Sequence, residues 1–285
     1  MKGTFTFIGN ATALISFGDI TLLTDPNFLH AGQYAYLGHG LVSKRLREPA
    51  MDIDELPRVD AVLLSHMHGD HWDRRTEAHL DPGTPIITTA HATKRLQRRG
   101  FGAAEALSTW GSTVVQRGNT TATVTAMPGR HGPTWTQTLR LVPPVMGSMI
   151  EFEHTTSGNE ADRLRIYVSG DTLYVDDLAE IPYRYPSIDT GVFHLGGTTL
   201  PFGQSPKRGL MVTMDAVQGA QAVELIDAKR SIPIHFDDYG VFASSLTEFE
   251  DETHRQGLAD RITYVRRGET VAIGADSSHD GGPFI

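Results

Sequence analysis

The chain has no cysteine and no long apolar run. The absence of cysteine among its 285 residues excludes disulfide bonds and thiolate metal ligands. No stretch approaches the roughly 20 apolar residues that cross a bilayer. The N-terminus alternates polar and apolar residues instead of forming the continuous apolar segment of a signal peptide. We therefore expect a cytoplasmic protein with no membrane partner.

Basic residues are outnumbered by acidic ones. Asp and Glu number 34 against 25 Lys and Arg, which gives a formal net charge of −9 and argues against a nucleic-acid surface. Basic residues gather at 44–47 and 94–99, where we expect solvated faces of a helix or loop. The expected partner is a small-molecule substrate. The oligomeric state stays open, a homo-oligomer included.

One short run carries much of the chemistry of this sequence. Residues 65–71 read SHMHGDH and follow an apolar run, and imidazole and carboxylate groups are ligands of Zn²⁺ and similar ions. His66 and His68 are two apart, so on an extended strand end they point to the same side. The glycine after them can turn the backbone, so that Asp70 and His71 face a second point nearby. The run therefore predicts a metal centre in which one loop serves two ions.

Further candidate ligands stand at the ends of predicted strands. His131, Asp171 and His235 each end or closely follow a β-rich segment. Separately each is a weak signal, because a strand-end His or Asp is more often a cap or a surface group. Together, and in this order after the histidine-rich run, they predict the remaining ligands of the metal centre.

The pattern of elements favours a sandwich of two β-rich halves with helices on the outer faces. A meander is expected over 4–8, 12–17 and 20–24, because Asx and Gly residues suited to tight turns separate these segments. Residues 27–57 show little periodicity, and both a lid over a site and a surface excursion with a short helix stay open. Other strands are predicted at 61–64, 86–89, 120–126, 148–153, 164–169, 190–195, 231–235 and within 262–273, and helices at 74–80, 93–99, 215–228 and 245–257.

With these residues in place, the chain resembles the metallo-β-lactamase-fold hydrolases from about Phe5 to Ile273. The resemblance implies an α+β fold, a four-layer αβ/βα sandwich, formed by a single domain over 1–285. It implies two divalent metal ions, with Zn as the first choice and Mn or Fe as alternatives. The implied ligands are His66, His68 and His131 for one ion, Asp70, His71 and His235 for the other, and Asp171 bridging both.

Asp25 matches the early acidic residue of this family, which supports the site from behind the ligands. Three segments are similar to the branch that contains ascorbate-6-phosphate lactonase and N-acyl-phosphatidylethanolamine phospholipase D: Ile8–Thr12, Ser169–Thr172 and Ile234–Asp237. Asn10 departs from that branch, which often has His after the glycine. The commonest true β-lactamases carry Cys where Asp171 stands, so the name of the fold does not give the activity.

The implied activity is that of a hydrolase. A hydroxide bridging two ions would attack an ester, lactone or phosphodiester of a small molecule, and Asp70 would also orient that hydroxide or accept its proton. His194 and Tyr239 are candidate acids for the leaving group, and the alternative for His194 is a core or supporting residue. Two less favoured alternatives are a diiron redox protein on the same fold and an RNA-processing nuclease.

Overall fold

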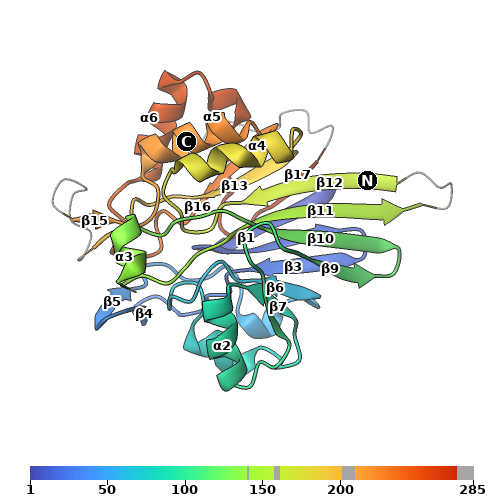
Figure 1. Cartoon of the computed structure of the whole chain (residues 1–285), viewed down its shortest axis with the longest axis horizontal. Coiled ribbons are helices and arrows are strands. Elements are labelled where there is room, and N and C mark those ends of the chain that lie inside the picture. Colours follow the sequence, from blue (N-terminus) through green and yellow to red (C-terminus); the bar gives the residue numbers. More distant parts are fainter. Residues whose placement is uncertain (140, 157–160, 201–208, 275–285) are drawn as a thin grey trace.

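Two β-sheets pack face to face, and helices cover both outer faces (Figure 1). The computed structural model describes residues 1–139, 141–156, 161–200 and 209–274. The predicted α+β four-layer sandwich is confirmed. The domain predicted over 1–285 includes 275–285, which lie outside the described residues. Among the described residues, every helix falls short of the length and apolar character that a bilayer span requires.

The first sheet begins with the predicted meander and continues with parallel strands. Its order is β17-β1-β2-β3-β6-β7-β8. Pairing is antiparallel from β17 to β3 and parallel from β3 to β8. The strands are β1 (Gly3–Gly9), β2 (Thr12–Phe17), β3 (Ile20–Thr24), β6 (Ala61–Leu63), β7 (Ile86–Thr88), β8 (Ala104–Ala106) and β17 (Thr270–Ile273).

The second sheet is also mixed, with the order β16-β13-β12-β11-β10-β9. Neighbours are antiparallel from β9 to β12, and β12, β13 and β16 run parallel to one another. Parallel strands bring their carboxyl ends to one edge of a sheet, where ligands commonly bind. The strands are β9 (Ser112–Arg117), β10 (Thr120–Met127), β11 (Gly147–Thr155), β12 (Ala161–Val168), β13 (Thr190–His194) and β16 (Arg230–Ile234).

Three apolar layers hold the sandwich together. Phe5 and Ile15 of the first sheet meet Phe152 and Ile166 of the second in the central layer. α2 (Ala90–Arg98) covers the outer face of the first sheet through its buried side chains. The other outer face is covered by α4 (Glu180–Arg184), α5 (Ala216–Ile226) and α6 (Leu246–Arg255) (Figure 1). The remaining short helices are η1 (Ile53–Glu55), α1 (Arg74–His79), α3 (Thr134–Thr138), η2 (Asp176–Ala179) and η3 (Ala259–Arg261).

The structure differs from the prediction most clearly within residues 27–57. This segment carries an antiparallel hairpin, β4 (Tyr34–Gly38) and β5 (Leu41–Lys44). Tyr34 and Tyr36 are more than half exposed, at 54% and 58%. The hairpin turns aromatic side chains toward solvent and buries small and aliphatic ones. Its alternation of buried and exposed residues therefore could not be recognised from hydrophobicity.

Other elements were missed or placed too broadly. β8 and α3 were not predicted, nor was a small sheet of β14 (Thr199–Leu200) and β15 (Leu210–Met211). The β-rich stretch predicted over 262–273 forms a strand only in its last four residues, as β17. Each of these strands is short, so its placement depends on pairing more than on local pattern.

Candidate metal centre

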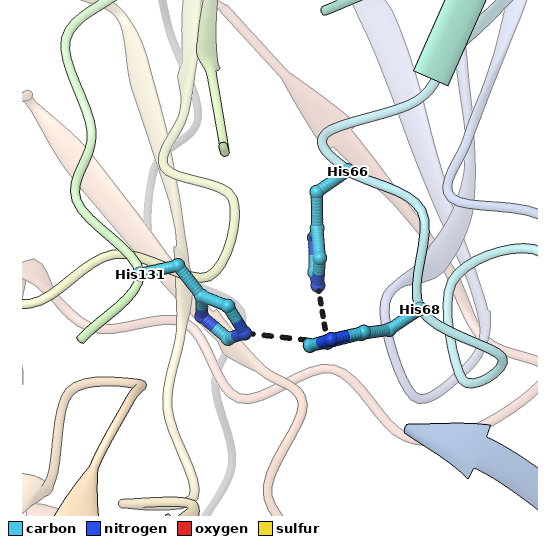
Figure 2. Close-up of side chains that lie close together, drawn as sticks. All are labelled: His66, His68 and His131. Atoms are coloured by element: carbon cyan, nitrogen blue, oxygen red, sulfur yellow. Dashed lines mark hydrogen bonds between the residues drawn. The ribbon is translucent and has the colours of Figure 1, made fainter. Parts of the chain in front are cut away.

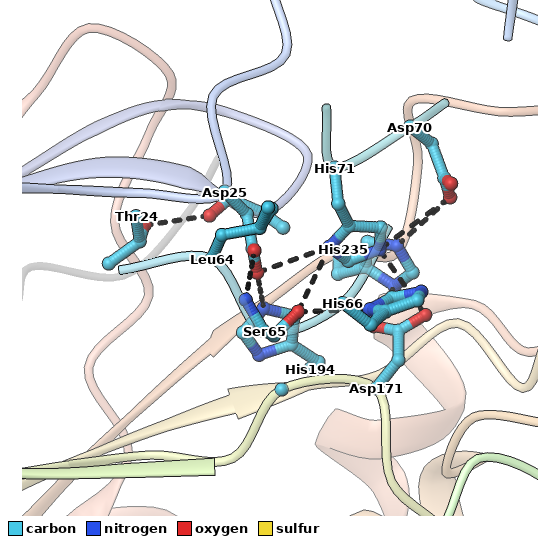
Figure 3. A network of polar contacts seen from close by, with 12 residues as sticks. Thr24, Asp25, Leu64, Ser65, His66, Asp70, His71, Asp171, His194 and His235 are labelled. Atoms are coloured by element: carbon cyan, nitrogen blue, oxygen red, sulfur yellow. Dashed lines mark hydrogen bonds and ion pairs between the residues drawn. The ribbon is translucent and has the colours of Figure 1, made fainter. Parts of the chain in front are cut away.

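The predicted ligands converge where strands of both sheets end. The run 65–71 follows β6, and His131 follows β10. Asp171 lies three residues after β12, and His235 directly follows β16. Side chains from four strand ends therefore meet in one buried cluster, much of which is visible in Figure 3.

Three histidines form the first part of the cluster. His68 Nδ1 lies 3.1 Å from His66 Nε2 and 3.3 Å from His131 Nε2 (Figure 2). Burial, together with neighbouring histidines, lowers the pKa of all three, that of His68 to about 3. All three rings therefore stay neutral near pH 7 and can present nitrogen lone pairs to a cation.

Two histidines and an aspartate form the second part. Asp70 Oδ2 lies 3.5 Å from His235 Nε2 and 3.7 Å from His71 Nε2. Burial raises the pKa of Asp70, but the positive charge of His71 and His235 outweighs this effect and brings it down to about 2. Burial likewise lowers the pKa of His71 and His235, but facing carboxylates outweigh it and raise both.

Asp171 lies between the two groups. Its Oδ2 is 3.4 Å from His71 Nε2, and its carboxylate can share an ion with His66 and His71. Thr213, which the sequence did not single out, donates a hydrogen bond of 2.9 Å to Asp171 Oδ2. The hydroxyl fixes the orientation of the carboxylate that joins the two groups.

Four of the histidines are oriented through Nδ1. The Nδ1 of His66 contacts Ser65 Oγ, that of His71 contacts Asp25 Oδ2, and the Nδ1 atoms of His131 and His235 contact the carbonyls of Asp171 and Leu195. A partner at Nδ1 sets the tautomer in which Nε2 is free to bind a metal. The rings therefore turn their Nε2 atoms toward one another.

The residues present fit divalent cations. The atoms Asp70 Oδ1, His71 Nε2, Asp171 Oδ1 and His235 Nε2 are buried and have no hydrogen-bond partner. Leaving one buried polar atom unpartnered costs about 1–3 kcal/mol, so four in one cluster would be costly unless a cation satisfies them. Their chemistry, imidazole nitrogen and carboxylate oxygen, suits Zn²⁺, Mn²⁺ or Fe²⁺.

Asp25, predicted to support the site, contacts the histidine-rich loop and two histidine rings. Its Oδ1 accepts the backbone N–H of Ser65 at 2.7 Å, and its Oδ2 lies 3.1 Å from His71 Nδ1. His194 Nε2 lies 3.4 Å from the same Oδ2. Asp25 thus holds both the start of the histidine-rich loop and one of its rings.

The two candidate acids have other contacts. His194 is fully buried, with Nε2 toward Asp25 and Nδ1 3.3 Å from Ser169 Oγ. The Tyr239 hydroxyl donates a 2.8 Å hydrogen bond to Asn27 Oδ1, and burial raises its pKa. His194 also lies against the second part of the cluster, with its ring stacked on that of His71 at 6.0 Å and 5.6 Å from that of His235. Together with Asp25 and His71 it forms a further group whose atoms could hold a metal ion.

Asn10 joins two ligand segments, a role that sequence reasoning missed. Its Nδ2 donates to the Asp70 carbonyl at 2.7 Å, and its own carbonyl accepts the His235 N–H at 3.0 Å. Its backbone N–H donates to Asp238 Oδ2 at 2.7 Å, and Asp238 is paired with the fully buried Arg45. The sequence signal that could have revealed this role was Asn10 itself, which follows the glycine where the similar branch of the family often has His.

Comparison with known proteins agrees with this fold. A family model described as "Beta-lactamase superfamily domain" matches residues 21–236. A "UPF0173 metal-dependent hydrolase" from Thermodesulfovibrio yellowstonii is 25% identical over 85% of this chain and 86% of its own length. The "N-acyl-phosphatidylethanolamine-hydrolyzing phospholipase D 1" of Caenorhabditis elegans is 24% identical over 86% of this chain but only 65% of its own length. The crystal structure of a "possible metal-dependent hydrolase" from Veillonella parvula superposes with a TM-score of 0.75 and 19% identity, over 95% of this chain and 99% of that one.

Proposed function

This chain belongs to the metallo-β-lactamase superfamily of metal-dependent hydrolases, and on that premise we propose that it hydrolyses an ester, lactone or phosphodiester bond of a small molecule. The observation that carries the proposal is a set of four buried atoms that have no hydrogen-bond partner, on Asp70, His71, Asp171 and His235, next to three neutral histidines. No serine or cysteine nucleophile is required by such a centre.

Each part of the cluster has its own task in this proposal. His66, His68 and His131 would hold one ion, Asp70, His71 and His235 would hold the other, and Asp171 would join the two groups. Two bound ions would lower the pKa of a water molecule and offset charge on the attacked group. Asp70 has an oxygen atom without a hydrogen-bond partner, so it can orient a nucleophilic water or accept its proton. The contacts of His194 favour a role in holding Asp25 over that of proton donor.

The test combines metal analysis with a substrate panel. Purified protein is analysed for bound transition metal and then assayed with lactones, carboxylic esters, phosphodiesters and β-lactams. We expect about two ions per chain and turnover of at least one of the first three classes. The variant His68→Ala should lose metal and turnover together, because His68 Nδ1 is central to the histidine trio. His79→Ala is the matched control, because His79 is an exposed histidine that pairs with Asp54.

Two results would contradict the proposal. Protein that binds no transition metal would remove its basis. So would unchanged metal content and hydrolysis in His68→Ala. Iron together with an O₂-dependent reaction would instead favour the diiron alternative.

A further inference from the structure

A cleft of about 560 Å³ opens beside the histidine trio. Tyr36 of β4 and His68 line it on the side of the metal centre, and His91 and Arg95 line it from α2. The segment 141–144, which reads Leu-Val-Pro-Pro, forms an apolar wall. Although the chain carries a net charge of −9, no acidic residue is among those that line this cleft in the described part of the chain.

A second cleft adjoins the first and shares Tyr36, Met67, His68 and Arg95 with it. The second cleft also has acidic residues, but these are already engaged. Asp73 accepts backbone N–H groups at the start of α1, and Glu77 pairs with Arg99 at 2.6 Å. Arg95 and His68 therefore lie where the two clefts meet, between the apolar wall of the first cleft and the arginine side chains of the second.

Arg95 has no salt bridge among the described residues. It is exposed on α2, four residues after His91 and hence on the same helical face. Burial and, to a smaller extent, the positive charge of Arg95 lower the pKa of His91, which places the two side chains close together on this wall. Arg99 is neutralised by Glu77, and Arg74 lines only the second cleft. These contacts single out Arg95 as the cation that faces the cleft next to His68.

We propose that Arg95 binds an anionic group of the substrate, a carboxylate or a phosphate, that is separate from the bond being hydrolysed. The apolar wall at 141–144 takes the hydrocarbon part of the same molecule. A guanidinium group suits this task because it always carries its charge and presents parallel N–H donors to two oxygen atoms of an anion. The inference rests on the proposed hydrolase function and narrows its substrate class to amphiphilic anions.

The test pairs substrates that differ only in a remote charge. The metal-loaded protein is assayed with 4-nitrophenyl hexanoate, which is neutral, and with mono-4-nitrophenyl adipate, which carries a distant carboxylate. We expect Arg95→Gln to lower kcat/KM for the charged ester by about tenfold, mainly through KM, because a charge-assisted hydrogen bond is lost. The kcat/KM for the neutral ester should change by less than about twofold, because this ester has no anionic group for Arg95 to bind. Arg98→Gln is the matched control, since Arg98 is an exposed arginine of the same helix that lines neither cleft.

A binding measurement separates this inference from the proposed function. Titration calorimetry of the same metal-loaded protein compares hexanoate with hexanamide. We expect hexanoate to bind more tightly, and its affinity to fall about tenfold in Arg95→Gln but not in Arg98→Gln. Absence of hydrolysis across the whole panel of lactones, esters and phosphodiesters, together with Arg95-dependent hexanoate binding, would reject the hydrolase and keep the anion site. Equal binding of the two probes, or equal effects of the two variants, would overturn the anion site even if both esters are hydrolysed.

Discussion

At the scale of single residues, the histidine-rich run was predictable because its chemistry is local. The alternation of His66 and His68 and the turn before Asp70 follow from backbone geometry alone. His131, Asp171 and His235 were found because strand ends are visible in the sequence. The contacts of His194 and Tyr239 were not predictable, because they depend on which residues of distant segments, Asp25 and Asn27, lie opposite them.

Asn10 yields a prediction at this scale. Replacement by Gly removes the Nδ2 bond to the Asp70 carbonyl but keeps the positive φ of 54° available, so the backbone bonds to Asp238 and His235 can persist. We expect metal affinity at the Asp70–His71–His235 group to fall by about 10–100-fold, as for other residues that orient ligands. Metal content measured after dialysis should drop toward one ion per chain.

The control for Asn10→Gly is Asp227→Gly. Asp227 has the same φ of 54°, but it ends α5 and its exposed carboxylate pairs with Arg261. This variant should keep its full metal content. If Asn10→Gly also retains two ions after dialysis, the side chain of Asn10 does not position the ligands.

At the scale of elements, the long strands and helices were predictable and the short hairpin over the site was not. β4 and β5 expose two tyrosines, so hydrophobic periodicity could not identify the face that packs. The hairpin is instead held by contacts with distant segments, among them Tyr239 and the histidine-rich loop 65–71. The Gly69 N–H donates to the Tyr36 carbonyl at 2.9 Å, and the hairpin thereby becomes a wall of the cleft.

Gly69→Ala tests this docking. An added Cβ would lie 2.6 Å from Tyr36 N and 2.8 Å from Tyr36 O, both backbone atoms, so the hairpin or the metal loop must shift. We expect a loss of about 1–3 kcal/mol in the free energy of unfolding, measured with urea, as for other overpacked sites. Activity should fall further than stability explains, because the shifted loop carries His68 and Asp70.

Gly102→Ala is the control for this variant. An added Cβ there meets no atom within 4 Å, and the residue does not have a positive φ. It should leave activity unchanged. Equal behaviour of the two glycine variants would show that the hairpin does not need close contact with the loop.

At the scale of the whole molecule, the site is the place where the two halves of the fold meet. The first sheet supplies the loop after β6, and the second supplies the residues after β10, β12 and β16. The sequence shows the two β-rich halves, but the parallel pairing of β12, β13 and β16, which aligns their ends, comes from the assembled sheet. Ions bound here would join the sheets, so metal binding and global stability should be linked.

Metal removal should therefore destabilise the whole fold, and the effect should depend on pH. A metal that binds only the folded state stabilises it by about 2.7 kcal/mol at a free concentration 100 times its Kd. The raised pKa values of His71 and His235 mean that metal binding must displace protons there, whereas the His68 pKa of about 3 leaves the histidine trio ready at neutral pH. As the pH falls, the affinity of the Asp70–His71–His235 group should fall first.

Scanning calorimetry at several pH values, with and without added Zn²⁺, measures this linkage. We expect a chelator to lower the unfolding temperature, and the gain from added metal to shrink as the pH falls from 8 to about 6, because protons then compete for His71 and His235. Metal analysis of the same samples should show one ion lost before the other. A gain in stability that is constant over this pH range would show that no proton leaves these histidines when metal binds.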